Sequence, residues 1–205
     1  MRLLLGTRNR GKLGEYWLLL ARPGLELVAA GELSLEIDEA EGTESLEENA
    51  VAKAALYARK SGLLTLAEDS GLFVDALGGG PGVLSARFGS SDRERIERLL
   101  GELKGVPGEK RGARFHCVIA LAEPAKVLRV FRGEVAGEIA QEPRGPSGFG
   151  YDPVFLLPRL DRTMAQLSLE EKNRISHRGK AARKALVLLE RLASAQPIDT
   201  GPSQT

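Results

Sequence analysis

The chain has few of the residues that build disulfides and zinc sites. Among 205 residues it has one cysteine, Cys117, and two histidines, His116 and His177. A single cysteine excludes an intrachain disulfide, and so small a set of sulfur and nitrogen ligands argues against a zinc cluster. The apolar neighbours of Cys117 predict a buried strand thiol rather than a nucleophile. Any metal is therefore expected on carboxylate oxygens, the ligands that suit Mg²⁺ or Mn²⁺.

Long apolar runs and an excess of charge of one sign are also missing. Nothing resembles a transmembrane span, and the first apolar residues run into Arg8, Arg10 and Lys12 instead of a signal-peptide core. We therefore expect a cytoplasmic protein with no membrane partner. The 29 basic and 28 acidic residues give a formal net charge of +1, which argues against a protein that coats nucleic acid. A small-molecule partner is favoured.

The stretch 63–88 is the most informative part of what is present. Its first five residues, LLTLA, are apolar apart from one threonine, as in a buried strand, and Glu68, Asp69 and Ser70 follow directly. Because open α/β sheets bind ligands beyond the ends of their strands, a carboxylate at this place can hold a metal. A dense run of glycines at 78–82 lets the backbone approach a ligand closely. The alternative is a flexible loop with an ordinary turn carboxylate.

The first 20 residues read as a strand, a polar turn and a helix that begins at Lys12. Exposed amides at a helix start favour phosphate, and Thr7, Asn9 and Lys12 add a hydroxyl, an amide and a cation. The alternative is a capped surface turn. The segment also nearly matches a phosphate-binding Walker A loop, but Leu13 stands where that loop needs a serine or threonine for its magnesium ion. The match indicates phosphate binding and is weak evidence for a P-loop.

A second helix is marked clearly at both of its ends. Ser45 and Glu48 predict a capping box at its start, and Gly62 predicts its stop. Asn49 and Lys53 lie one turn apart beside its apolar stripe, so Lys53 can point into a pocket. A solvated lysine is the alternative.

The loop before this helix is rich in acidic residues. Glu41 lies in it beside Asp38, Glu39 and Glu44, and a divalent cation would relieve their mutual repulsion. Most acidic loops are merely solvated, but Asp69 offers a second carboxylate from a nearby strand. These two segments together therefore predict a metal site.

Downstream, further elements alternate between helix and strand. Ser91 caps a helix whose core stripe includes Ile96 and Leu99, and we assign this helix no chemistry. Residues 113–122 and 127–140 predict an antiparallel pair of strands. A last short strand is expected at 154–157.

The segment 143–155 has too many glycines and prolines for regular structure, and such loops inside a compact domain tend to be functional. Phe149 lies between two glycines and offers a stacking surface of the kind a nucleobase uses. Asp152 can accept hydrogen bonds from base edges. The alternative is that Phe149 and Tyr151 fill the core beneath the loop.

Lys172, His177 and Arg178 cluster near the joint between the last two predicted helices. A histidine beside an arginine gives planar donors that suit carbonyl or phosphate oxygens. A solvated cationic helix face is the alternative. From residue 195 onward the chain is polar, and we expect a disordered tail over 195–205.

Taken together, these motifs resemble the inosine triphosphate pyrophosphatase family, whose members cleave non-standard purine nucleoside triphosphates. The resemblance covers nearly the whole chain, and five motifs in the family's order argue strongly against chance. The motifs are TRNRGK (7–12), ENAVAKA (48–54), EDSGLFVDALGGGPGVLSAR (68–87), GFGYDPVF (148–155) and EKNRISHRGKA (171–181). One departure is Glu68, where related sequences often carry a second aspartate, but the carboxylate is kept.

The resemblance implies an elongated α/β fold of two lobes on a twisted mixed β-sheet, with flanking helices and a central nucleotide cleft. It implies one catalytic domain over residues 1–194 and a homodimer. Mg²⁺, with Mn²⁺ as an alternative, would bind to Glu41 and Asp69, and Asp69 would also be the catalytic base. The implied substrate-binding residues are Thr7, Arg8, Asn9, Arg10, Gly11, Lys12, Lys53 and Ser70 for the triphosphate, and Phe149, Gly150, Tyr151, Asp152, Lys172, His177 and Arg178 for the purine and sugar.

The implied reaction is hydrolysis of ITP, dITP and XTP to the nucleoside monophosphate and pyrophosphate. This reaction would remove these nucleotides before they are incorporated into DNA or RNA. Two alternatives stay open. A P-loop-like NTPase or phosphotransferase is disfavoured by Leu13, and a non-catalytic nucleotide-binding module lacks the expected basic stripe and repeated exposed aromatics. No nucleic-acid partner is expected.

Overall fold

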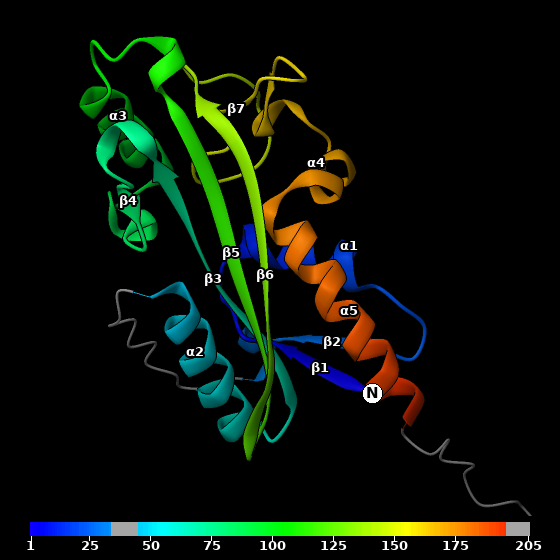
Figure 1. Cartoon of the computed structure of the whole chain (residues 1–205). Coiled ribbons are helices and arrows are strands. Elements are labelled where there is room, and N and C mark those ends of the chain that lie inside the picture. Colours follow the sequence, from blue (N-terminus) through cyan, green and yellow to red (C-terminus); the bar gives the residue numbers. More distant parts are fainter. Residues whose placement is uncertain (34–44, 196–205) are drawn as a thin grey trace, which may run out of the picture.

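The computed structural model describes residues 1–33 and 45–195, and one mixed β-sheet with helices on both faces forms its frame (Figure 1). The helices are α1 (Arg10–Leu20), α2 (Leu46–Ser61), α3 (Asp92–Glu102), α4 (Leu169–Ile175) and α5 (His177–Ala195). The strands are β1 (Arg2–Leu5), β2 (Glu26–Ala29), β3 (Leu64–Val74), β4 (Pro81–Gly82), β5 (Gly112–Glu123), β6 (Lys126–Ile139), β7 (Phe155–Leu157) and β8 (Arg162–Thr163).

The order of the strands makes the sheet mixed. It runs β2-β1-β3-β5-β6-β7-β8, and β4 pairs with β3 beside this path. Both β2 and β3 lie parallel to β1, whereas the pairs from β3 onward are antiparallel. The predicted α/β fold on a twisted mixed sheet is therefore confirmed.

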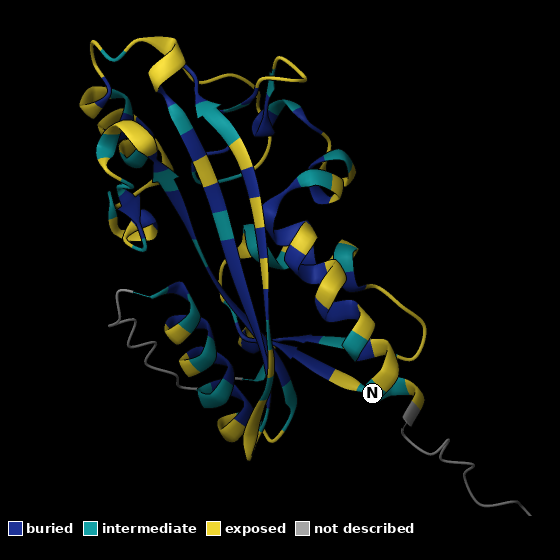
Figure 2. Cartoon of the chain, in the orientation of Figure 1, coloured by how far each residue is buried: buried dark blue, intermediate teal, exposed yellow. Residues whose placement is uncertain are grey.

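Three long strands, β3, β5 and β6, run through two lobes that have separate cores (Figure 1). In the lobe that contains the N-terminus, α2 covers one face of the sheet through Ala50 and Ala54, and α1 and α5 cover the opposite face. In the other lobe, Leu99 of α3 belongs to the same buried cluster as Phe115 and Phe155. Figure 2 shows buried residues along β3 and β5 and exposed residues on the outer side of α5. This arrangement confirms the two lobes.

The ends of α2 form as its sequence predicts. The Ser45 hydroxyl accepts a hydrogen bond from the Glu48 N–H at 3.4 Å, which satisfies one of the free amides of the first turn. Gly62 ends the helix in the left-handed conformation, with φ of 71°, and its N–H donates to the Ala58 carbonyl. Glycine adopts this conformation without the steric cost of a Cβ atom. The helix is therefore fixed at both ends over β3 and β5.

β3 differs from the prediction in one respect that matters for function. Glu68, Asp69 and Ser70 do not follow the strand but lie inside it, because β3 pairs with β5 continuously from Thr65 to Val74. Pairing along a ten-residue partner overrides the weak strand preference of aspartate, serine and glycine. The opposite edge of β3 pairs with β1 only as far as Leu66 and with β4 only from Leu72 onward. Within the described residues, that edge has no partner strand over 67–71, and the two lobes meet there.

Smaller differences lie at the ends of other elements. α1 begins at Arg10, two residues before the predicted start, and an unpredicted short strand, β8, pairs with β7. α5 runs to Ala195, and the rest of the predicted tail, 196–205, lies outside the described residues, as does Glu41. Among the described residues, no helix combines the length and apolar character needed to cross a membrane.

Candidate active site

A cavity of about 120 Å³ lies against the open edge of β3, where the two lobes meet. Its walls come from the turn before α1, from β3, from the start of α3, from the loop 148–152 and from the joint between α4 and α5. The predicted site residues that line it are Asn9, Lys12, Ser70, Phe149, Gly150, Tyr151, Asp152, Lys172, His177 and Arg178. Segments far apart in the sequence therefore meet in one cleft.

Arg178 is the most buried cation of the cleft and lies between two carboxylates. Its Nε and Nη2 atoms donate to Glu68 at 2.7 and 2.8 Å, and its Nη1 donates to Glu15 at 2.5 Å. Lys172 continues the network by pairing with Glu15 at 2.6 Å and with Asp152. Buried charges persist only when each has partners of the opposite sign, and here carboxylates and cations alternate. The orientation of the guanidinium plane is therefore fixed before any ligand binds.

Glu68 is the acidic centre of the same network. Besides Arg178, it pairs with Lys12 at 3.0 Å and accepts hydrogen bonds from the Tyr16 hydroxyl and from Ser70. Burial opposes ionisation of Glu68, but the charges of Arg178 and Lys12 outweigh burial and hold its pKa well below the usual range. Lys12 and Arg178 thus share one ionised carboxylate.

His177 is buried and neutral. Its ring stacks on Phe115 with centroids 4.7 Å apart, and burial, assisted by the positive charge of Arg178, holds its pKa well below the usual value. Its Nδ1 atom has no hydrogen-bond partner among the described residues. Buried polar atoms normally have partners, so this nitrogen marks a place where a ligand atom can bind.

The side chains of Phe149 and Tyr151 point in different directions, although the two residues are close in sequence. Tyr151 points into the core and Phe149 into the cleft. Tyr151 is buried and donates its hydroxyl to the Ser85 carbonyl at 2.9 Å, as the core-filling alternative predicts. The Phe149 ring lines the cleft, with the ammonium of Lys172 4.7 Å and the guanidinium of Arg178 5.4 Å from its centroid. A Cβ atom added to Gly11 would lie 2.4 Å from this ring. The glycine is therefore required by the close approach of the ring.

Asp69 faces the other side of the sheet, because side chains alternate along a strand. Its carboxylate accepts hydrogen bonds from Asn49 Nδ2 at 3.0 Å and from Lys53 Nζ at 3.2 Å. Lys53 therefore points toward Asp69 rather than into solvent, and its side chain is only 8% exposed. Such hard oxygen atoms suit Mg²⁺ or Mn²⁺. Glu41, the second predicted ligand, lies outside the described residues, and those described contain no cluster of three His, Cys, Asp or Glu side chains.

The turn before α1 and the first two residues of that helix supply the remaining predicted residues. The Asn9 side chain caps α1 by accepting from the Lys12 N–H at 3.0 Å, and the Thr7 hydroxyl accepts from the Asn9 N–H at 3.2 Å. Arg8 is exposed in the same turn. Arg10 and Gly11 line a neighbouring cavity of about 240 Å³ that also touches Phe149.

This chain is similar to known proteins in both sequence and fold. The profile of the Ham1 family matches residues 3–187. The chain belongs to the Ham1 family. It is 52% identical over 184 residues to the dITP/XTP pyrophosphatase of Gloeobacter violaceus, covering 90% of this chain and 92% of that relative. It is 45% identical over 201 residues to the dITP/XTP pyrophosphatase of Desulforamulus reducens, covering 97% of this chain and 100% of that relative.

Solved Ham1 structures have the same fold. The HAM1 protein from Coxiella burnetii superposes with a TM-score of 0.81 at 40% identity, covering 93% of this chain and 99% of its own. The Staphylococcus aureus Ham1 protein gives 0.79 at 38% identity, covering 94% of this chain and 100% of its own. The resemblance stated from the motifs is therefore confirmed.

Two residues of this Ham1 site were missed from the sequence. Glu15 is buried between Arg178 and Lys172, and Tyr16 is buried against Glu68. Both lie on the first helix, where a glutamate three residues after a lysine reads as an ordinary surface pair. Tyr16 is one of the apolar residues of this helix at helical spacing, but nothing local indicates that Glu15 is buried. The partners that bury Glu15, Lys172 and Arg178, lie on α4 and α5, more than 150 residues away.

Proposed function

We propose that this Ham1 protein hydrolyses ITP, dITP and XTP to the nucleoside monophosphate and pyrophosphate in the cytoplasm, and so removes them from the nucleotide pool. One observation carries the proposal. A single cleft joins a cationic helix start at Lys12 to an aromatic surface at Phe149, and both lie beside the open edge of β3. The dITP/XTP pyrophosphatases that the chain resembles over almost their whole length support the substrate class.

The triphosphate is held at the start of α1. Lys12 lies at the cleft wall, and the free amides of the first turn and the positive end of the helix dipole favour an anion there. Lys12 is already oriented by Glu68 at 3.0 Å. A phosphate that reaches Lys12 therefore meets a positioned cation with little cost in side-chain entropy.

Asp69 acts as the base that takes a proton from the attacking water. Asn49 and Lys53 fix both of its oxygens, so the carboxylate faces the reaction in one orientation. Asp69 and Glu41 would hold an Mg²⁺ ion, and its positive charge would offset the charge that develops on the phosphates. Mn²⁺, which has similar ligand preferences, is the expected substitute.

The purine binds on Phe149, where its ring can stack. Arg178 and Lys172 lie beside this ring, and His177, whose Nδ1 has no hydrogen-bond partner among the described residues, lines the same cleft. Donors here match the 6-oxo group of hypoxanthine and xanthine, whereas the 6-amino group of ATP would leave them unpaired. An unmatched buried polar group costs about 1–3 kcal/mol, so ATP is disfavoured by roughly 5- to 150-fold for each one.

The products of ITP hydrolysis test this function. Purified protein is incubated with ITP and Mg²⁺, and the products are separated by ion-exchange chromatography. We expect IMP and pyrophosphate. IDP and orthophosphate would support a P-loop-like NTPase or phosphotransferase, and tight binding without any product would support a binding module.

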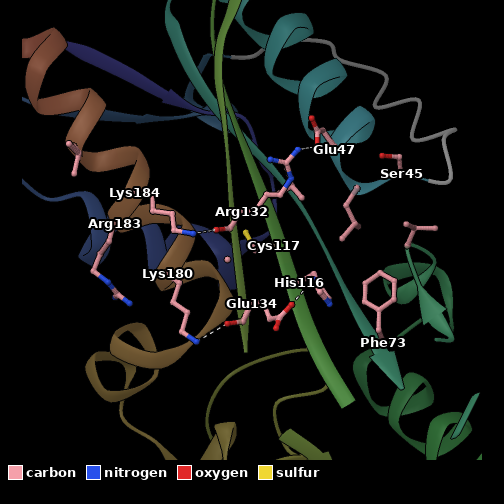
Figure 3. Close-up of a pocket in the computed structure, with 15 residues that line it drawn as sticks. Ser45, Glu47, Phe73, His116, Cys117, Arg132, Glu134, Lys180, Arg183 and Lys184 are labelled. Carbon is pink, nitrogen blue, oxygen red and sulfur yellow. Dashed lines mark hydrogen bonds and ion pairs between the residues drawn. The ribbon is translucent and has the colours of Figure 1, made fainter. Parts of the chain in front are cut away.

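We also propose that the protein is a homodimer that assembles through a groove between α2 and α5. The groove has a volume of about 950 Å³ and an apolar floor that includes Phe73 and Val118. Figure 3 shows Lys180 and Lys184 reaching across the edge of β6, and Glu134 lying near them. A two-fold interface places the same patch of both copies in contact. A groove with an apolar floor and both positive and negative charges at its rim can be complementary to the same groove of a second copy.

The mass in solution tests the dimer. Val187 lines the groove and is 52% exposed, so a Val187→Glu substitution should separate the subunits without disturbing a core. Leu160→Glu is the matched control, because Leu160 is 50% exposed outside the groove. Light scattering should find twice the mass of one chain for the wild type and the control, and one chain for Val187→Glu. A monomeric wild type, or a dimeric Val187→Glu protein, contradicts the proposed interface.

A further inference from the structure

The first residue of α3 reaches across the cleft to the loop that bears Phe149. The carboxylate of Asp92 accepts a hydrogen bond from the Gly150 N–H, with 2.6 Å between Oδ2 and N. The two residues are 58 positions apart in the chain. Gly150 directly follows Phe149 and has a φ of 62°. The contact therefore fixes the peptide unit that joins Phe149 to Gly150.

Other contacts hold the loop from different sides. The Phe149 N–H donates to Asp152 at 2.8 Å, and the Tyr151 hydroxyl donates to the Ser85 carbonyl. Asp152 also pairs with Lys172, so changing it would disturb the buried network as well. Asp92 is not part of that network, and its side chain is half-exposed at the cleft rim. The effect of changing Asp92 can therefore be measured without disturbing the buried ion pairs.

α3 is anchored in the core and holds Asp92 in a fixed position. Ile96 and Leu99 anchor the helix in the core of the lobe. The second carboxylate oxygen of Asp92 lies 3.3 Å from Arg95, whose Nε donates to the Ser91 carbonyl at 3.2 Å. Asp92 and Arg95 both line the cleft. A hydrogen bond that the loop donates to a carboxylate on a rigid helix restrains a glycine-rich loop more than a contact within the loop does.

We propose that Asp92 is a positioning residue for the purine, acting through the Phe149 ring. The inference rests on the proposed role of Phe149 as the stacking surface. The ring lies close against Gly11, in the same turn that carries Lys12, so a small displacement of the loop changes both the stacking surface and its distance from the phosphate side. Asp69 and Lys53 lie on the other face of β3. Loss of Asp92 should therefore weaken substrate binding and leave the chemical step intact.

A double-mutant cycle with Phe149 tests this role. Asp92→Ala, Asp92→Asn and the control Glu97→Ala are each made alone, and Asp92→Ala is also combined with Phe149→Ala. Glu97 is an exposed residue of the same helix that pairs with Arg93 and lies outside the cleft lining. For each protein KM and kcat are measured with ITP.

We expect Asp92→Ala to raise KM about 5- to 20-fold, because one charge-assisted hydrogen bond to the loop is lost, and to change kcat less than about twofold. Asp92→Asn should have a smaller effect, since its amide oxygen can still accept from Gly150. Glu97→Ala should behave as wild type. In the Phe149→Ala background, Asp92→Ala should add less than about twofold.

Three results would overturn the inference. An unchanged KM in Asp92→Ala would show that Asp92 does not position the purine. An equal rise in KM with and without Phe149 means that Asp92 acts through something other than the ring. A fall in kcat with KM unchanged in Asp92→Asn, which preserves folding most closely, assigns Asp92 to chemistry instead. If Phe149→Ala itself leaves KM unchanged, the stacking role of Phe149 is wrong, and that failure is distinguishable because it does not involve Asp92.

Discussion

Replacing Glu68 by glutamine should destabilise the protein strongly, because this carboxylate lies at the centre of the buried network. It accepts two bonds from Arg178, at 2.7 and 2.8 Å, pairs with Lys12 at 3.0 Å and accepts from the Tyr16 hydroxyl. Its side chain is fully buried. Glutamine has nearly the same shape but carries no charge, and its amide would place a donor against a donor. The substitution therefore removes one charge without creating a cavity.

The magnitude follows from the partners that remain. Removing one member of a buried ion pair costs about 3–5 kcal/mol, because the other charge is left uncompensated. Arg178 keeps Glu15, and Lys12 is 17% exposed and can be rehydrated, so we expect the lower end, about 3 kcal/mol. For a domain of this size that corresponds to a fall in Tm of roughly 6–12 °C.

Urea unfolding followed by circular dichroism measures this change. Glu97→Gln, which alters an exposed ion pair on α3, is the control and should leave the unfolding midpoint almost unchanged. A loss below about 1 kcal/mol in Glu68→Gln would refute the reasoning.

The free energy of unfolding at acidic pH provides a second check. The folded pKa of Glu68 lies below its unfolded value of 4.5, so its contribution is present above pH 4.5 and is lost as the pH falls further. The variant should therefore lose less stability than the wild type below that pH.

Three further predictions concern single residues. His177 is held neutral by burial, with a folded pKa well below 6.5, so stability should fall by about 1.4 kcal/mol per pH unit below pH 6.5, and a His177→Gln variant should lack this slope in pH-dependent thermal unfolding. Asp69→Asn should lower kcat for ITP about 10²- to 10⁴-fold while its circular dichroism spectrum is kept, and near-normal turnover would disprove its role as base. Gly11→Ala should raise KM for ITP at least about fivefold, because the new methyl group displaces the Phe149 ring, and an unchanged KM would show that ring position is unimportant.

Local signals in the sequence predict much of this site. Ser45 and Gly62 mark the ends of α2, and helical spacing on it places Asn49 and Lys53 on one line, where both contact Asp69. These features depend on hydrogen bonds within one turn and on the period of a helix, which neighbouring residues determine.

Features that depend on distant partners could not be predicted in the same way. β3 continues through Glu68–Ser70 because β5 pairs with it, so the cleft opens at a strand edge that no other described strand pairs with, rather than at a strand end. The burial of Glu15 depends equally on Arg178, which α5 delivers from the far end of the chain. Neither partner is visible from the residues next to these positions.

Substrate selectivity tests the central claim, that the triphosphate is hydrolysed at the open edge of β3 while the purine is recognised in the cleft beside it. The measurement is kcat/KM of the wild-type protein for ITP, XTP and ATP under the same conditions with Mg²⁺. The account predicts values for ITP and XTP at least about 30-fold above that for ATP, because two or more unmatched polar groups cost about 1–3 kcal/mol each. Equal values for the three nucleotides would contradict the assignment of Lys172, His177 and Arg178 to the purine.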